Sequence, residues 1–222
     1  KGIVDIYPAM NPLGVDSITR GVPGFDIDMN RIFPGSEEGA VTEHIATQIM
    51  EDISGADFCV DIHASNIFLR EILQVRMSEG TAEQLLPYAK LLNTDFIWVH
   101  GAATVLESTL AHGLNTSGVP TVVVEMGVGM RITKNYGLRL TEGILCLMKR
   151  LGIWEGETIA PKEPMTSDNR KIGLVHANTA GIFLPSMEHQ GMVGVGERIG
   201  EILNPLDGTV LETVVSPVEG MI

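Results

Sequence analysis

The strongest constraint on the fold is an alternation along the first 156 residues between short apolar runs and longer amphipathic segments. The runs are rich in β-branched residues and have the length of strands, as in IVDIYPAM, DFCVDIHAS, ILQVRM, FIWVH and PTVVVEMG. The segments between them have helical periodicity, as in EHIATQIMEDIS, AEQLLPYAKLLN and YGLRLTEGILCLMKRLG. Alternation of this kind predicts an α/β sheet covered by helices. PTVVVEMG does not alternate, so we expect it to be a strand buried on both faces.

The pattern changes after this region. Residues 157–170 are rich in Pro, Glu and Ser and lack periodicity, which predicts a linker between an α/β domain at 1–156 and a second domain at 171–222. The second domain has short runs separated by Gly and Pro, typical of a small all-β structure. We expect further chain before Lys1, because KGIVDIYPAM is typical of a strand within a fold. We also expect it after Ile222, because SPVEGMI resembles the start of a hairpin.

Composition narrows the class of protein. The net charge of −13 argues against a nucleic-acid partner, whose binding depends on Lys and Arg. No apolar run reaches the roughly 18 residues of a membrane span, so a membrane partner is not expected. The two cysteines, Cys59 and Cys146, lie in apolar patterns and are expected to be buried free thiols. A reducing compartment, the cytoplasm, is consistent with them. Whether the chain forms a homo-oligomer is left open.

His63 is the first candidate for chemistry. Asp61 and His63 are two residues apart at the end of a predicted strand, so their side chains share one face at an edge where α/β proteins often bind ligands. Neutral imidazole is a common metal ligand, but a lone histidine is also common in protein cores. One histidine cannot form a zinc site, because zinc takes three or four ligands.

Two further features carry polar side chains. Asn30 and Arg31 are adjacent in DIDMNRIFPG, where an amide and a planar guanidinium could bind one carboxylate, or could belong to a solvated turn. Arg20, in TRGVPG, could be a surface charge or an oxyanion donor. Glu125 ends the apolar strand VVVEMG, where an unpaired carboxylate would be costly to bury. It is therefore either paired or faces a site, where burial would suit it to act as a general base.

Taken in order, these motifs resemble the succinylglutamate desuccinylase and aspartoacylase group of the zinc carboxypeptidase superfamily. The resemblance spans nearly the whole chain. It rests on Asn11-Pro12, Arg20, the DxDxNRxFPG motif from Asp26 to Gly35, Asp61 to His63, Val124 to Gly127, and the β domain that follows. It implies a mixed, twisted sheet flanked by helices, as in zinc carboxypeptidases, with a small all-β C-terminal domain.

The resemblance also implies roles for single residues. His63 is similar to the third zinc ligand of one zinc ion per chain, and Asp28 to the carboxylate that orients another zinc histidine. Glu125 resembles the general base and Arg20 the arginine that polarises the scissile carbonyl. Asn30 and Arg31 resemble the pair that binds the substrate carboxylate. The implied activity is zinc-dependent hydrolysis of a small N-acyl amino acid or related carboxylated amide, by water that the metal activates.

The chain departs from the family pattern at two places. The first two zinc ligands of the family come from an HxxE motif, and no His here is followed by Glu three positions later. We therefore expect those ligands before Lys1, although a zinc-free relative is the other interpretation. The additional arginine that aspartoacylase carries before its glutamate strand is also missing, which argues against N-acetylaspartate as substrate. Arg70 and Arg76 could supply a different contact, although Arg76 is first of all an alternating strand residue.

Three alternatives stay open. A carboxypeptidase or an ester hydrolase would use the same residues, although the β domain of the family narrows access to small substrates. A metal-free relative would only bind small acids through Asn30 and Arg31. The C-terminal region also resembles lipoyl and biotinyl carrier domains, but no lysine follows Lys171 in this sequence, so we do not expect a swinging-arm carrier.

Overall fold

The structure is a computed structural model that describes residues 2–101, 106–168 and 172–222. The chain divides into two compact units, Lys1–Asn169 and Arg170–Ile222. The first contains helices and a sheet, and the second contains strands alone among its described residues. The segment 157–170, predicted as a linker, contributes the strand β5 (Met165–Asp168) to the sheet of the first unit.

A mixed sheet forms the centre of the first unit. Its strands are β1 (Cys59–His63), β4 (Thr121–Met126), β2 (Leu73–Ser78), β3 (Phe96–His100) and β5, in that spatial order. β1 pairs parallel with β4, β4 antiparallel with β2, and β2, β3 and β5 run parallel to one another. The carboxyl ends of β1 and β4 therefore lie beside the amino ends of β2 and β3. The prediction of a mixed α/β sheet is confirmed.

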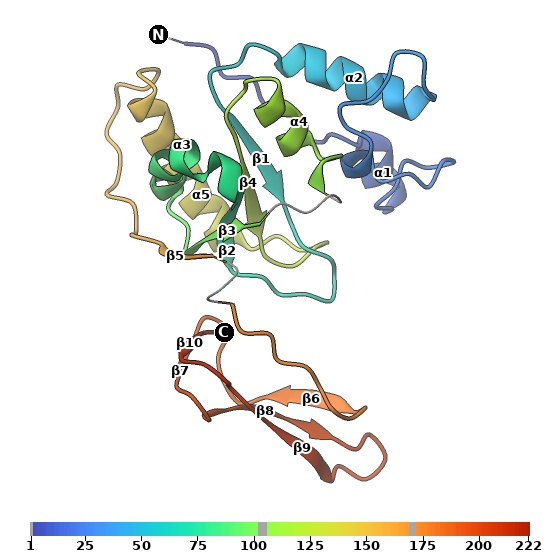
Figure 1. Ribbon diagram of the computed structural model, residues 1–222, viewed down its shortest axis with the longest axis vertical. Coiled ribbons are helices and arrows are strands. Elements are labelled where there is room, and N and C mark those ends of the chain that lie inside the picture. Colours follow the sequence, from blue (N-terminus) through green and yellow to red (C-terminus); the bar gives the residue numbers. More distant parts are fainter. Residues whose placement is uncertain (1, 102–105, 169–171) are drawn as a thin grey trace. The chain divides into compact units, whose positions relative to one another are not determined.

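Helices flank this sheet, as Figure 1 shows. They are α1 (Pro12–Ser17), η1 (Met29–Arg31), α2 (Val41–Ile53), α3 (Glu79–Ala89), η2 (Lys90–Leu92), α4 (Leu110–Thr116) and α5 (Lys134–Arg150). None of the helices in the described ranges is long and apolar enough to span a membrane.

One face of the sheet forms the main hydrophobic core. Because side chains alternate along a strand, every second residue of β2, β3 and β4 faces α3 and α5. The fully buried residues of this cluster include Leu73, Val75, Ile97, Val122 and Val124, joined by Leu85 of α3 and Leu140 of α5. The apolar runs of the sequence are thus explained by the burial of this face.

The opposite face of the sheet is polar at its centre. The strand register aligns His63 with Glu125, Glu125 with Gln74, and Arg76 with Trp98. Register partners share a face, and so does every second residue along a strand. This side of the sheet therefore carries Asp61, His63, Glu125, Gln74, Arg76, Trp98 and His100. A second apolar cluster, with members from α2, α4 and the 22–33 segment, packs against Cys59 of β1. The fold therefore presents a row of polar side chains across four adjacent strands.

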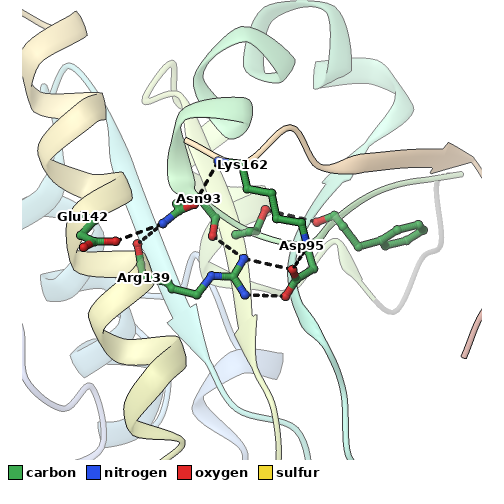
Figure 2. A network of polar contacts seen from close by, with 7 residues as sticks. Asn93, Asp95, Arg139, Glu142 and Lys162 are labelled. Carbon is green, nitrogen blue, oxygen red and sulfur yellow. Dashed lines mark hydrogen bonds and ion pairs between the residues drawn. The ribbon is translucent and has the colours of Figure 1, made fainter. Parts of the chain in front are cut away.

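A buried ion pair anchors the core face at the start of β3. Asp95 accepts hydrogen bonds from both terminal nitrogens of Arg139 at 2.8 and 3.0 Å, and from Lys162 at 2.6 Å. Figure 2 shows how these side chains converge from α5, from the turn before β3 and from the segment before β5. The side chain of Asp95 is only 3% exposed. Burial raises the pKa of Asp95, but the hydrogen bonds and charges of Arg139 and Lys162 outweigh it, so this pKa lies below its ordinary value.

The second unit consists of short strands. β6 (Ile182–Pro185), β8 (Arg198–Leu203) and β9 (Val210–Val215) form an antiparallel sheet, and β7 (Met192–Val193) pairs with β10 (Gly220–Met221). The prediction of a small β structure at the C-terminus is confirmed. The residues at SPVEGMI end in β10, which pairs with β7.

Three local predictions differ from the structure. IVDIYPAM was predicted to be a strand, but residues 3–10 pair with no strand among the described residues, and Ile3 and Ile6 are exposed. Asn11-Pro12, a dipeptide typical of a turn, instead begins α1, where Asn11 accepts a hydrogen bond from the Gly14 amide. The sequence did not predict α4, because it is short and its side chains include His112, Asn115 and Thr116.

Candidate active site

The carboxyl ends of β1 and β4 bring His63 and Glu125 together. The two residues are register partners, so their side chains leave neighbouring strands on the same face. Nε2 of His63 lies 3.0 Å from Oδ2 of Asp61. The two groups are not oriented for a hydrogen bond, and both atoms are buried without a hydrogen-bond partner. Two of the predicted site residues thus meet at one place, beside a second carboxylate.

The electrostatic balance around His63 and Glu125 follows from burial and from charged neighbours. Burial lowers the pKa of His63, but the contact with Asp61 and the charges of Asp61 and Glu125 raise it more, so the net shift is upward. Burial raises the pKa of Glu125, and the opposing charge of Arg76 offsets this only in part. A carboxyl group with a raised pKa is a better proton acceptor than an exposed one.

Arg20 lies close enough for its charge to lower the pKa of His63. Its Nε and Nη2 atoms donate to Oδ2 of Asp28 at 2.9 and 2.8 Å. Asn11, which caps α1, donates a 3.4 Å hydrogen bond from its amide to the Arg20 carbonyl oxygen. The Arg20 side chain is 69% exposed, so these contacts orient a side chain that remains accessible to a ligand.

Asp28 and Asn30 are built into the loop around η1. Oδ1 of Asp28 accepts a 3.0 Å hydrogen bond from the main-chain N–H of Asn30, and Oδ2 accepts from the guanidinium of Arg20. Oδ1 of Asn30 accepts from the Leu110 amide at the start of α4, at 2.8 Å. The amide oxygen of Asn30 is therefore engaged in docking α4, which leaves its NH2 group as the part suited to a ligand carboxylate.

Arg31 is exposed, and its Nη1 donates to the Asn30 carbonyl oxygen at 2.6 Å. In the described part of the chain, no contact joins Arg31 to His63 or Glu125. The structure thus connects His63, Glu125, Arg20, Asp28 and Asn30 through shared strands, charges and hydrogen bonds. Arg31 follows Asn30 in sequence, without a direct contact to the other members.

The sequence analysis named Arg76 as a possible contact but missed the residues around it, Glu71, Gln74 and Trp98. Oε1 of Glu71 accepts a 2.6 Å hydrogen bond from Arg76, and Oε2 accepts a 3.0 Å bond from Gln74. Nη1 of Arg76 lies 3.6 Å from Oε1 of Glu125, and the carbon of its guanidinium lies over the Trp98 ring, 5.1 Å from the ring centroid. The signal was present in LQVRMS, where Gln74 and Arg76 have the two-residue spacing of side chains on one face.

The unpartnered polar atoms mark this face as unusual. Five buried side-chain N or O atoms of the described residues lack a hydrogen-bond partner: Oγ1 of Thr42, Oδ2 of Asp61, Nε2 of His63, Nε of Arg76 and Oε2 of Glu125. All except Thr42 lie on the polar face of β1, β2 and β4. Buried polar groups are normally hydrogen-bonded, so a cluster of exceptions indicates a place where a ligand or ion belongs.

The polar side chains on this face include some of the groups that a metal site needs. His63 offers a buried, unpartnered nitrogen beside a carboxylate, which suits a zinc ligand. Across residues 2–101, 106–168 and 172–222, however, no group of three or more His, Cys, Asp or Glu side chains could hold a metal ion. The described residues therefore offer one histidine nitrogen suited to a metal and no complete metal site.

Two surface hollows have volumes of about 260 and 120 Å³. The first is lined by Glu142, Leu145, Glu157, Thr158 and Ile159, and the second by Thr19, Gly21, Val22, Pro23, Gly24 and Asp26. Neither includes His63 or Glu125. The first has no other feature that indicates chemistry, so we base the candidate site on the unpartnered atoms of the polar face and not on cavity size.

Comparison with known protein families decides the identity of the first unit. The model of the succinylglutamate desuccinylase/aspartoacylase catalytic domain matches residues 1–151. The chain belongs to the succinylglutamate desuccinylase/aspartoacylase family. The resemblance inferred from the motifs is thereby confirmed.

Relatives of the chain include proteins with a named activity. It is 27% identical over 217 residues to N-alpha-acetyl-L-2,4-diaminobutyric acid deacetylase of Halomonas elongata. The match covers 90% of this chain, and the chain spans only 58% of the length of that curated relative.

Solved structures show the same fold. Succinylglutamate desuccinylase/aspartoacylase from Rhodobacter sphaeroides superposes with a TM-score of 0.79 and 23% identity, over 96% of this chain and 67% of that chain. The product-bound ectoine utilization protein EutE (DoeB) from Ruegeria pomeroyi also gives 0.79, with 19% identity, over 98% and 68% of the two chains. At these identities the likeness establishes the family fold, with its mixed sheet and C-terminal β region.

Proposed function

We propose that this protein is a zinc-dependent deacylase that hydrolyses the amide bond of a small N-acyl amino acid or related carboxylated amide. One observation carries the proposal: His63 and Glu125 are register partners, and both have buried, unpartnered polar atoms on the same face. Membership of a family that includes a named deacetylase supports the reaction class.

His63 and Glu125 have different proposed roles. We propose His63 as one zinc ligand, with the remaining ligands outside the described residues. A zinc ion bound there would act as a Lewis acid and lower the pKa of water toward about 7. Glu125 would accept a proton from the attacking water and later donate it to the leaving amine. Burial of Glu125, which raises its pKa, suits it to both steps.

The cationic and amide groups would bind the substrate. Arg20, accessible and oriented by Asp28, would donate hydrogen bonds to the carbonyl oxygen as negative charge develops on it. The NH2 group of Asn30 and the guanidinium of Arg31 would bind a carboxylate. This assignment selects small acidic amides, in which the scissile bond lies a few atoms from a carboxylate.

The direct test uses the full-length protein, stripped with a chelator and then reconstituted with zinc. Amine release from N-acetyl and N-succinyl amino acids should disappear on chelation and return with about one equivalent of zinc. Release of C-terminal residues from peptides instead would favour a carboxypeptidase. Retention of N-acyl amino acids without turnover or zinc uptake would favour a metal-free binding protein and overturn the proposal.

A further inference from the structure

Arg76 has a role that neither its strand nor the family comparison assigns. It lies on β2, the strand on the far side of β4 from His63. Glu125 on β4 therefore has His63 as its register partner on β1 and Gln74 as its register partner on β2, and Arg76 lies two residues after Gln74 on the same face. Nη1 of Arg76 lies 3.6 Å from Oε1 of Glu125, whereas Oε2 of the same carboxylate is buried without a partner.

The guanidinium of Arg76 is itself held from two further directions. Its Nη2 donates a 2.6 Å hydrogen bond to Oε1 of Glu71. Its carbon centre lies over the Trp98 ring, 5.1 Å from the ring centroid, which is within the range of a cation–π contact. The hydrogen bond to Glu71 and the contact with Trp98 together restrict the rotamers of Arg76.

Glu71 is braced in turn. Its Oε2 accepts from the Gln74 amide at 3.0 Å, and Oγ of Ser65 lies 3.4 Å from its Oε1. The side chains of Glu71 and Glu125 are only 10% and 12% exposed, so solvent competes little for these contacts. Such support from surrounding residues is what holds a reactive group within a fraction of an ångström of its working position.

We propose that Arg76 is a positioning residue that fixes the carboxylate of Glu125 through Oε1, so that Oε2 is the oxygen that meets the attacking water. The inference rests on the proposed function, because it takes Glu125 as the general base. It adds to that function the group of residues that orients the base, namely Glu71, Arg76 and Trp98. The contacts of Arg76 among the described residues are with Glu71, Glu125 and Trp98 and not with His63, so we expect metal binding not to depend on it.

The kinetic test compares Arg76→Gln and Arg76→Lys with the wild-type full-length protein. In Arg76→Gln we expect kcat to fall about 10- to 100-fold with KM changed less than about threefold, the pattern of an interaction made only in the transition state. Arg76→Lys keeps the charge without the planar fork and should give an intermediate kcat. Bound zinc should stay unchanged in both variants. The exposed Arg150 at the end of α5 provides the matched control, and Arg150→Gln should behave as wild type.

Crystal structures of the wild type and Arg76→Gln give a readout that does not need turnover. Glu125 should occupy one conformation in the wild type and a different or split one in the variant. The inference is overturned if Glu125 is unmoved, if kcat is unchanged, if KM rises at constant kcat as for a substrate contact, or if zinc is lost. Failure of the proposed function has a separate signature, a zinc-loaded wild type that hydrolyses no N-acyl amino acid while Glu125 still moves in the variant.

Discussion

His63 has an unpartnered buried nitrogen, and its imidazole lies outside both hydrophobic clusters of the first unit. A single substitution therefore distinguishes the two interpretations of this histidine, as a core residue or as a metal ligand. In His63→Ala we expect zinc to fall from about one equivalent to background, because a site with three or four ligands tolerates the loss of one poorly. The free energy of unfolding of the metal-free protein should change by less than about 1 kcal/mol.

Metal analysis after dialysis and urea denaturation of the chelated protein measure the two effects. His112, exposed on α4, supplies the control, since His112→Ala should keep its zinc. Full zinc retention in His63→Ala would show that this histidine belongs to the core and not to a metal site.

Glu125 allows a substitution that changes its chemistry and almost nothing else. Glu125→Gln keeps the shape of the side chain but cannot accept a proton, so kcat should fall by about 10²- to 10⁴-fold. Zinc content should be unchanged, because the proposed ligand is His63. Steady-state kinetics with parallel metal analysis make the measurement, and a variant within threefold of wild-type kcat would remove Glu125 from the mechanism.

The docking of α4 onto the η1 loop depends on Asn30, whose two ends have different tasks. Its Oδ1 accepts from the Leu110 amide, and its NH2 group is proposed to bind substrate. Asn30→Asp keeps the acceptor and replaces the donor by a negative charge. The fold should therefore remain while KM for an acidic substrate rises at least about tenfold, the cost of roughly 1.4 kcal/mol.

Asn30→Ala loses both functions and serves as the comparison. It should also lower the free energy of unfolding by about 1 kcal/mol, the usual contribution of a helix-capping hydrogen bond. If both variants destabilise the protein equally and leave KM unchanged, Asn30 is a structural residue alone.

The ion pair between α5 and the start of β3 should make stability depend on pH. The pKa of Asp95 is lowered in the folded state, so its contribution is present above the unfolded value of about 3.9 and is lost as the pH falls through the folded value. At pH 7, Asp95→Asn should cost about 3 kcal/mol, because Arg139 is left with an uncompensated charge.

Urea denaturation of both proteins between pH 7 and pH 3 tests this dependence. The difference between wild type and Asp95→Asn should shrink below about pH 4. Asp16→Asn, at an exposed position of α1, should show no such difference. A gap between wild type and Asp95→Asn that stays constant with pH would mean that packing, and not charge, accounts for the loss.

Across the whole molecule, sequence patterns predicted the features of the fold that depend on local hydrophobic periodicity. The apolar runs around His63 and Glu125 predicted β1 and β4, and the position of each residue at a strand end predicted that both would face a site. Sequence did not predict that β2 would insert antiparallel beside β4, because strand register is set by tertiary pairing. The contact of Arg76 with Glu125 depends on that pairing. IVDIYPAM has strand composition, yet no described strand pairs with it.

The two cysteines report on the integrity of the first unit as a whole. Cys59 packs against the cluster around α2 and α4, and burial raises its pKa to about 11. Cys146 is buried on α5, where its thiol lies 3.5 Å from the Ile159 carbonyl oxygen. The thiolate is the nucleophile that attacks a thiol reagent, so both cysteines should react slowly in the native protein at pH 8 and quickly in guanidinium chloride.

A thiol-reagent time course on the wild type, Cys59→Ser and Cys146→Ser assigns each rate to one residue. Both native rates should rise in step with the unfolded fraction as denaturant is added, because each thiol becomes accessible when the packing around it is lost. Fast native reaction of Cys59 alone would show that the α2 and α4 side opens independently of the main core. The packing of α2 and α4 against β1 would then be mobile in the native protein. The fixed geometry of His63 and Glu125, on which the proposed chemistry depends, would be lost.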